Sequence, residues 1–291
     1  MPQNFQPYTG LHGVETEPLV RPFSAERAEA EWMFDWLDGA PEPAKSLLGT
    51  SAIRLGGGVV TSMKNDPVSY WSKALGFDSA IDASTIGAIV DFYRLSGTAS
   101  ATIQIAPDLL PPNWQVICRE FGLTAGPSWV KLAGSSDVAV ELPTDLRVDA
   151  VGPNDLTAWA DVVFRGFGMP AGHLSSIAAA SAGRGAIQAF GVWHNSTLVA
   201  GASLAIVDGV GALLGAATLP EYRGRGAQSA LIAVRAQSAR RAGVDRVVAE
   251  TGVPTTEGAN PSLNNLLRAG LVPLYERANW QWTNPDLTTS P

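Results

Sequence analysis

Two arginines and two glycines lie close together in residues 219–232, LPEYRGRGAQSALI, just before an apolar, alanine-rich stretch. A turn followed by a helix leaves backbone N–H groups and the positive end of the helix dipole at one point. Gly224 and Gly226 lack side chains, so a ligand can approach the main chain closely. Arg223 and Arg225 add forked donors for phosphate oxygens. The segment therefore predicts a site for a phosphate-bearing ligand; the alternative is an ordinary turn with solvated arginines.

Three kinds of phosphate-binding loop fit this segment to different degrees. A Walker A loop requires Lys followed by Ser or Thr after its last glycine, whereas Ala227 and Gln228 stand here. A dinucleotide-binding fingerprint fits Gly224 and Gly226, with Glu250 ending the next strand, but the third glycine is missing and the preceding strands are antiparallel. The third option is coenzyme A. A nucleotide-binding protein that uses the same loop remains an alternative.

The elements around the loop follow from turns and periodicity. Residues 186–219 predict three short antiparallel strands, with tight turns at His194-Asn195-Ser196 and Asp208-Gly209. A helix over about 226–242 follows, in which Arg235 and Arg241 are expected to point to solvent. A strand, a helix and a long final strand are then predicted over 246–250, 262–270 and 273–282.

The first half of the chain repeats part of this order. A helix ending at Gly97, a strand, a helix ending at Gly122 and another strand resemble the pattern around Gly243 and Gly270. The glycines of each pair are 25 and 27 residues apart. This spacing predicts an internal duplication of one α/β unit. The alternative is that two unrelated α/β stretches have similar helix-ending and turn residues. A boundary is expected in the polar segment LPTD at 142–145.

The composition restricts the classes of function. The formal net charge of −7 argues against general nucleic-acid binding. Residues 1–145 carry 9 Lys and Arg against 17 Asp and Glu, whereas residues 146–291 carry 11 against 10, all 11 being arginine. Anion binding is therefore expected in the second half, although solvated faces alone could give this asymmetry. The single Cys118 excludes an internal disulfide and a cysteine-built zinc site.

Targeting signals are not evident in the sequence. The first ten residues, MPQNFQPYTG, have neither a basic region nor an apolar run, so no signal peptide is expected. The uncharged stretches are interrupted by Gly, Pro and polar residues, so no transmembrane helix is expected. A cytoplasmic protein without a membrane partner is the resulting expectation.

Residues 146–283 resemble a catalytic domain of the GNAT superfamily of N-acetyltransferases, whose signature is (Q/R)-x-x-G-x-(G/A). Arg223 and Gly226 match the signature, and Gln228 departs from its last position. The first half resembles a degenerate copy, as in tandem members of the superfamily. The resemblance implies an α/β (α+β) fold with two tandem domains, each a mixed, mostly antiparallel sheet flanked by helices, over 1–145 and 146–291.

The resemblance also implies where acetyl-CoA would bind as cosubstrate. The pantetheine arm would lie against the strand that ends near Ala217 and Thr218 and enter a V-shaped opening beside RVVAE. Asn260 or Asn265 could hydrogen-bond coenzyme A, or serve as a helix cap and a surface residue. The pyrophosphate would rest on the loop and helix start formed by Arg223, Gly224, Arg225, Gly226, Ala227, Gln228 and Ser229.

The resemblance further implies a primary amine of a small molecule or peptide as acceptor. No metal, nucleic acid or membrane is implied, and the chain is expected to be a monomer or homodimer. A coenzyme A-binding module without turnover is the runner-up, because a tyrosine that many family members carry near Asn264 and Asn265 is missing.

Candidates for proton transfer are few. Glu250, at a strand end facing the expected cleft, is the candidate base, or an ordinary solvated strand end. Tyr275 and Tyr222 are substitute acids, or packed aromatics. His173 lies where the family places acceptor-binding helices, and a lone histidine there is also compatible with a structural role.

The first half lacks an equivalent phosphate loop. Asp78 and Asp82 precede its corresponding helix, and their carboxylates would repel a pyrophosphate. The run at 56–58, three glycines, is expected to mark a bulge or close backbone packing within a strand. The first half is therefore predicted to support or shape the acceptor site without catalysing the reaction.

Overall fold

A single continuous sheet organises the chain. The computed structural model describes residues 22–138, 144–185, 187–254 and 260–287. Within these residues, eleven strands pair in the order β1-β2-β3-β4-β11-β5-β10-β9-β8-β7-β6. Residues 1–10 and part of the expected boundary at 142–145 lie outside the described residues.

The first half forms four helices and five strands in the described part of the chain. The helices are α1 (Pro22–Asp38), α2 (Ala44–Leu48), α3 (Ala83–Leu95) and α4 (Trp114–Phe121). The strands are β1 (Thr50–Leu55), β2 (Gly58–Met63), β3 (Lys73–Leu75), β4 (Ser100–Gln104) and β5 (Thr124–Ser135).

The second half forms four helices and six strands among the described residues. The helices are α5 (Leu156–Gly166), α6 (His173–Gly183), α7 (Ala227–Arg241) and α8 (Pro261–Arg268). The strands are β6 (Arg147–Ala150), β7 (Gln188–His194), β8 (Thr197–Val207), β9 (Val210–Thr218), β10 (Arg246–Gly252) and β11 (Val272–Thr283). The predicted antiparallel strands β7, β8 and β9 are present, with turns at the predicted positions.

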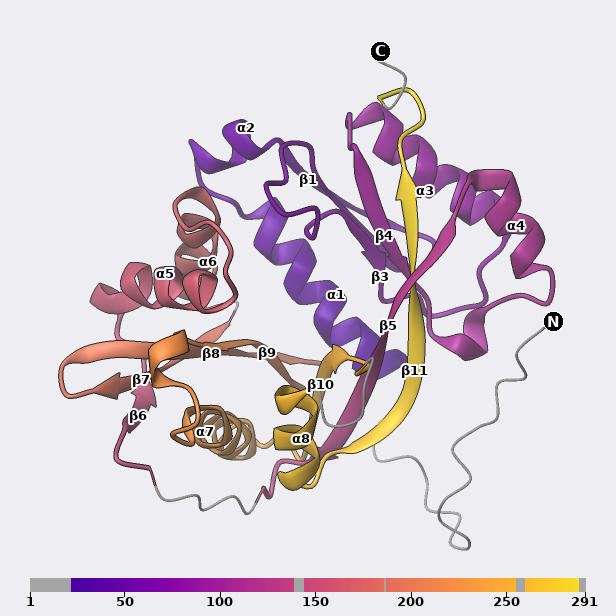
Figure 1. The fold of residues 1–291 in the computed structure, drawn as a ribbon. Coiled ribbons are helices and arrows are strands. Elements are labelled where there is room, and N and C mark those ends of the chain that lie inside the picture. The colour runs from indigo at the N-terminus through magenta and orange to yellow at the C-terminus, as the bar shows by residue number, and fades with distance from the viewer. Residues whose placement is uncertain (1–21, 139–143, 186, 255–259, 288–291) are drawn as a thin grey trace, which may run out of the picture.

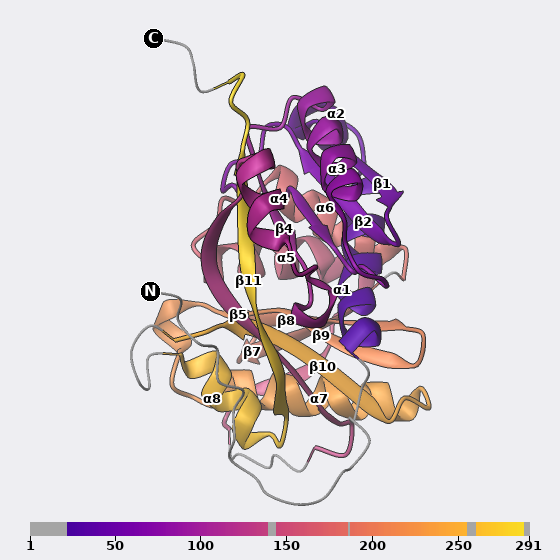
Figure 2. The same ribbon diagram turned by 90° about the vertical axis from the view of Figure 1, so that its right-hand side faces the viewer.

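The last strand of each half pairs with the other half. β5 lies beside β10, where Lys131 faces Glu250, and β11 lies beside β4, where Trp280 faces Ile103. The two exchanged strands also pair with each other, and Figure 2 shows them running side by side through the molecule. Both halves follow the order of two helices, three strands, helix, strand, helix, strand, which β6 precedes in the second half. Duplication as the origin of this order stays a prediction.

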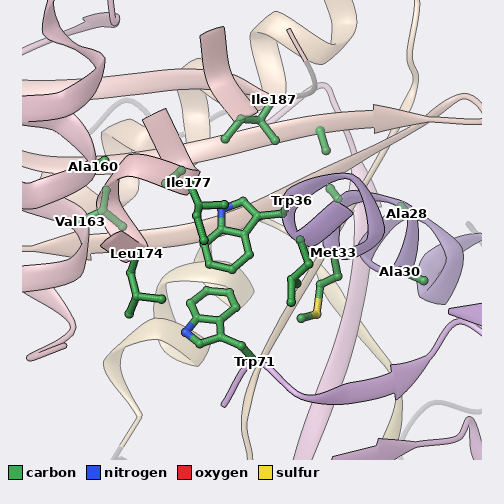
Figure 3. Packing of buried hydrophobic residues seen from close by; sticks show 14 of the residues in the cluster. Ala28, Ala30, Met33, Trp36, Trp71, Ala160, Val163, Leu174, Ile177 and Ile187 are labelled. Atoms are coloured by element: carbon green, nitrogen blue, oxygen red, sulfur yellow. The ribbon is translucent and has the colours of Figure 1, made fainter. Parts of the chain in front are cut away.

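Helices cover both faces of the sheet. On the side of β7–β10, α7 and α8 lie on one face and α1, α5 and α6 on the other (Figure 1). The core on the α1 side combines both halves, because Trp36 and Trp71 pack among Leu174 and Ile177 (Figure 3). Gly201 admits Trp159 against β8, since a Cβ there would lie 2.7 Å from the indole ring.

One local expectation was confirmed in part and one was wrong. Gly56 and Gly57, at φ 61° and 78°, form the turn between β1 and β2 and not a bulge. Gly58 begins β2 and is closely packed as the alternative expected, because a Cβ there would lie 2.7 Å from the Leu75 carbonyl oxygen. Arg235 is 2% exposed and does not point to solvent, because its guanidinium donates to backbone carbonyls of β8 and β9. No described helix is long and apolar enough to cross a membrane.

The strand exchange predicts that the two halves unfold together. Leu132 on β5 is fully buried and lies opposite Ala249 of β10 and Pro273 of β11. Leu132→Ala should lower the free energy of unfolding by about 2–5 kcal/mol, with one transition seen by circular dichroism and by tryptophan fluorescence. Leu95→Ala, at a side chain that is 89% exposed, should change it by less than about 0.5 kcal/mol. Separate transitions for the two probes would contradict the shared core.

Candidate active site

β9 and β10 pair briefly and then diverge. Their parallel pairing covers Arg246 with Val210, Val247 with Gly211 and Val248 with Ala212. Beyond these pairs β9 continues to Thr218 and β10 to Gly252 without further pairing between them. A cavity of about 490 Å³ lies at this divergence. Its lining includes side chains of α7 and α8 from one face of the sheet and of α1 and α5 from the other.

A buried arginine holds β9 where it leaves β10. The pairing of β8 with β9 shifts register after Gly201, and Gly215 has φ 51°. Arg235 donates to the carbonyl oxygens of Ser203 and Leu214 at 3.0 and 3.1 Å, and to Leu231 at 2.9 Å. Burial lowers the pKa of Arg235 to about 9, so it stays charged at neutral pH. Its donors therefore satisfy carbonyls at the irregular part of β9.

The predicted phosphate loop leads directly into α7. Gly224 and Gly226 have φ 77° and 79°, and Gly226 is the N-cap of α7 without a side-chain cap. The first N–H groups of a helix have no partner within the helix. Gln228 lines the cavity, and its Nε2 lies 3.4 Å from Thr218 Oγ1. The neighbouring Ala227 and Ser229 are buried. The loop thus directs backbone donors and a dipole end beside the opening.

The two loop arginines have protein partners. Arg223 donates from Nε to the Thr218 carbonyl at 3.2 Å and from Nη2 to the Gly166 carbonyl at 3.0 Å. Arg225 forms an ion pair with the exposed carboxylate of Asp145. Arg223 therefore joins the ends of β9 and α5, and a phosphate at Arg225 would compete with Asp145.

The two predicted asparagines differ in their roles in the structure. Asn260 caps α8 by accepting from the Leu263 N–H, and its Nδ2 donates to Thr251 Oγ1 at 3.1 Å and to the Gly252 carbonyl at 2.5 Å. Asn260 thus ties the start of α8 to the end of β10. Asn265 accepts a hydrogen bond from Arg268 on the surface of α8. The α8 residues that line the cavity are Ser262 and Leu266.

An ionic cluster lies under one wall of the cavity. Lys131 Nζ on β5 is 2.7 Å from Glu250 Oε2 and 2.7 Å from Glu29 Oε2 of α1. Arg277 on β11 pairs with Glu250 and with Glu26 of α1. All five side chains are less than 10% exposed. The cluster therefore joins α1, β5, β10 and β11 in a low-dielectric interior, where incomplete pairing is costly.

Burial and charge shift the pKa values of the cluster in opposite directions. Burial alone would raise the pKa of Glu29, but the attraction of Lys131 and Arg277 outweighs it, and the pKa is strongly lowered. Burial would lower the pKa of Lys131, but the carboxylates raise it overall. For Glu250, burial is the largest effect and the attraction of Arg277 does not cancel it, so its pKa is raised. Glu250 thus accepts a proton more readily than Glu29.

Of the four candidate proton-transfer residues, Tyr222 lies near His194 outside the cavity lining, and Glu250 lines the cavity. Its Oε1 is buried and has no hydrogen-bond partner among the described residues, while Oε2 binds Lys131 and Arg277. Tyr275 lies in the cluster but not in the cavity lining, and donates to Glu26 Oε1 at 2.6 Å. Burial and the charge of Glu26 raise the pKa of Tyr275 strongly. His173 is exposed at the start of α6, away from the lining.

Sequence reasoning missed the partners of Glu250. Glu26 and Glu29 are three residues apart on α1 and so share one helical face. Lys131 interrupts an apolar run in β5, and a charge inside such a run is a signal of a buried partner. The local sequence does not indicate which of these charges pair with each other. The reason is that α1 and β11 are about 250 residues apart in the chain, as the Arg277–Glu26 pair shows.

Removal of one carboxylate from the ionic cluster should lower the free energy of unfolding. Glu29→Gln should lower the free energy of unfolding at pH 7 by about 3–5 kcal/mol, because Lys131 loses a buried partner. Glu31→Gln, at the partly exposed pair of Glu31 with Arg54, should cost no more than about 1 kcal/mol. Urea unfolding of the two variants measures the difference, and equal costs would contradict the prediction.

The cost of Glu29→Gln should also depend on pH. The folded-state pKa of Glu29 is lowered, so its contribution is fully present above its unfolded pKa of about 4.3 and is lost as the pH falls toward the folded value. The difference in unfolding free energy between wild type and variant should therefore shrink below about pH 4. A difference between wild type and variant that grows as the pH falls would contradict a lowered folded-state pKa of Glu29.

Known proteins are similar to this chain in the sequence of one segment and in fold. Residues 156–263, from α5 into α8, match the sequence profile described as the acetyltransferase (GNAT) family. No curated protein matches the chain. A GCN5-related N-acetyltransferase from Kribbella flavida superposes with a TM-score of 0.59 at 17% identity, covering 84% of this chain and 95% of that one.

Two further solved structures share the arrangement. A GCN5-related N-acetyltransferase from Sphaerobacter thermophilus has a TM-score of 0.57 at 14% identity, covering 80% of this chain and 76% of that one. A tandem GNAT protein from the clavulanic acid biosynthesis pathway has a TM-score of 0.54 at 15% identity, covering 89% and 96%. The segment 156–263 is therefore similar in sequence to the GNAT acetyltransferases, and the chain as a whole has the fold of GNAT structures.

Proposed function

We propose that the chain is an acetyl-CoA-dependent N-acetyltransferase that acetylates a primary amine by direct attack within a ternary complex. The observation that carries the proposal is the unpartnered Oε1 of Glu250 at the cavity where β9 and β10 diverge. A carboxylate oxygen without a partner, in a site open to a ligand, is placed to accept a proton from an amine.

Acetyl-CoA fits the described groups on the α7 side. The N–H groups at the start of α7 and the glycines before it suit a pyrophosphate. Beyond Ala212, β9 has no strand partner on the β10 side, so its backbone groups there are available to the amides of a pantetheine arm. The acyl group would then lie toward the divergence, near Glu250. The residues at the loop are those that the sequence predicted.

The proposed reaction needs one proton acceptor and one oxyanion donor. An alkylammonium has a pKa of about 10.4, so it must lose a proton before or during attack. Glu250 Oε1 takes this proton and the amine nitrogen bonds to the thioester carbon. The nitrogen then loses its second proton to water as the carbon–sulfur bond breaks. A backbone N–H of β9 near Thr218 or the irregular segment at Gly215 would stabilise the oxyanion. The departing thiolate takes a proton from water or from the acid form of Glu250.

Tyr275 is poorly placed to act as the acid that protonates the departing thiolate, whereas Glu250 is well placed to act as the base. Its hydroxyl is engaged by Glu26, and its pKa is strongly raised. A coenzyme A-binding module without turnover is the second candidate, and the hydrogen bond from the Tyr275 hydroxyl to Glu26 favours it, because Tyr275 is then not free to protonate the departing thiolate. Release of free coenzyme A in the presence of amines separates the two candidates.

Acetyl-CoA should bind at one site per chain, and the pair of Arg225 with Asp145 should modulate it. Arg225→Ala should weaken binding by about 1–3 kcal/mol if Arg225 contacts phosphate. Asp145→Asn should leave binding unchanged or strengthen it, because the competing carboxylate is removed. Titration calorimetry measures both, with Arg241→Ala, exposed at the far end of α7, as control. Two equivalent sites, or weaker binding by Asp145→Asn, would contradict this assignment.

Glu250→Gln should lower kcat about 100-fold or more while acetyl-CoA affinity is retained. Because the pKa of Glu250 is raised, wild-type kcat should rise with pH as Glu250 loses its proton, and the variant should lack this limb. Tyr275→Phe should cost less. Normal turnover in Glu250→Gln with an unchanged pH profile would remove Glu250 from the mechanism.

Direct transfer predicts that no acetyl group is carried by the protein. Cys118 lies on α4, is 5% exposed, and burial raises the pKa of its thiol, so it is a poor nucleophile. Cys118→Ala should retain kcat, and mass spectrometry of the protein mixed with acetyl-CoA should find no acetylated cysteine. A trapped acetyl-cysteine would overturn the direct-transfer scheme.

A further inference from the structure

Aromatic side chains dominate the part of the cavity that lies on the α1 side of the sheet. They come from both halves of the chain and from four separate segments: α1, the connection between β2 and β3, β5, and α5 with the turn after it. The aromatic residues of the lining are Trp32, Trp36, Tyr70, Trp71, Trp129, Trp159, Phe164 and Phe167. An apolar lining of this kind is suited to a ligand with an apolar body.

The rings hold one another in place. Trp36 and Trp71 are stacked, with ring centroids 4.1 Å apart and an interplanar angle of 20°. Tyr70 meets Trp71 edge-on at 5.0 Å and lies 6.3 Å from Trp129. Figure 3 shows Trp36 and Trp71 packed against each other beneath the side chains of the α5–α6 layer. Because these contacts are made without a ligand, the aromatic walls are preorganised, which lowers the cost of binding.

On the α1 side of the sheet, the charged groups of the lining lie together rather than being spread through the aromatic part. Glu29, Lys131 and Glu250 belong to one cluster, in which Glu250 Oε1 is left without a partner. A ligand on this side therefore meets a carboxylate oxygen that is free for an amine, next to walls of aromatic carbon. This pairing selects a molecule with one amine at the end of an apolar body.

A buried cation disfavours a second positive charge in the aromatic part. Lys73 on β3 is 2% exposed, and its Nζ has no hydrogen-bond acceptor among the described residues. It lies 3.7 Å from the centroid of the Tyr70 ring and 5.4 Å from that of Trp129. A second ammonium placed against the same two rings would be repelled by Lys73 in a medium of low dielectric constant. A polyamine is therefore a poor fit.

Resting on the proposed acetyltransferase function, we infer that the acceptor is an aromatic monoamine: a primary amine on a short chain attached to a flat, uncharged ring. The amine lies at Glu250 Oε1 and the ring lies among Trp32, Tyr70, Trp71 and Trp129. The cavity of about 490 Å³ spans both faces of the sheet, and its aromatic part on the α1 side receives the ring. Ring-on-ring contact and burial of apolar area then favour this class over sugars and polyamines.

A panel of amines with saturating acetyl-CoA tests the class. Phenethylamine and tryptamine should show kcat/KM values at least about 100-fold above those of glucosamine and spermidine, measured by release of free coenzyme A. A preference for glucosamine or spermidine would overturn the inference and leave the acetyltransferase function standing. If no amine causes release of free coenzyme A, the result counts against the proposed function. The binding measurement below then decides the ligand class independently.

Binding is measured by calorimetry on the full chain with coenzyme A present. Phenethylamine should bind at least about tenfold more tightly than spermidine, a difference that one good aromatic contact can supply. Equal or reversed affinities would overturn the inference whether or not the protein turns over acetyl-CoA. Tighter phenethylamine binding without coenzyme A release would retain the aromatic amine site and reject catalysis.

Two half-buried aromatics on α1 provide a matched pair of variants. Trp32 lines the cavity, whereas Phe34, two residues away, lies under the Arg54 guanidinium at 4.4 Å and outside the lining. Trp32→Ala should weaken phenethylamine binding about tenfold with acetyl-CoA affinity unchanged, and Trp32→Phe should restore most of it. Phe34→Ala should leave phenethylamine binding unchanged. Equal losses in Trp32→Ala and Phe34→Ala would show a general effect on α1 and contradict a ring-binding role for Trp32.

Discussion

Three buried carboxylates share two buried cations where α1, β5, β10 and β11 meet. Such a cluster is costly to desolvate, and the loss of one partner destabilises the fold, so its geometry has to be fixed from several directions. The exchange of β5 and β11 supplies this constraint. Lys131 reaches Glu250 because β5 lies next to β10, and Arg277 reaches both Glu26 and Glu250 because β11 lies next to β5. The environment of Glu250 is therefore built by both halves of the chain.

The same exchange explains the shape of the cavity. β10 is held by β5 along seven residue pairs, whereas it is held by β9 along three. With one edge firmly paired and the other edge released, β10 can diverge from β9 without unravelling. Arg235 stabilises the opposite side by donating to carbonyls of β8 and β9 near the register shift. The opening through the sheet thus leaves β9 backbone groups beyond Ala212 without a partner on β10, while Arg235 satisfies two carbonyls at the register shift.

The first half contributes walls and charges to the cavity. Asp82 accepts from the Thr85 N–H and caps α3, so it has a local structural role at the helix start where the second half has its arginine-glycine loop. Glu29, Trp32 and Trp71 of the first half nevertheless line the cavity beside residues of α5 and β10. The proposed acceptor site is consequently a joint product of the two halves, while the proposed acetyl-CoA site is formed by the second half.

Local sequence signals determined the elements and the loop. Glycines and turn residues predicted the antiparallel strands β7–β9, the start of α7 and the end of α8, because these signals act over a few residues. The strand end predicted at Glu250 was two residues short, because β10 continues to Gly252. Tertiary structure alone decided the strand exchange, since a strand of alternating or apolar residues does not specify its neighbour. It likewise decided the burial of Arg235 on α7, whose partners are backbone carbonyls of β8 and β9. The hydrogen bond of Tyr275 to Glu26 was decided in the same way. Periodicity reports which face of an element is buried, but the partner of a buried charge is set only when distant segments pack together.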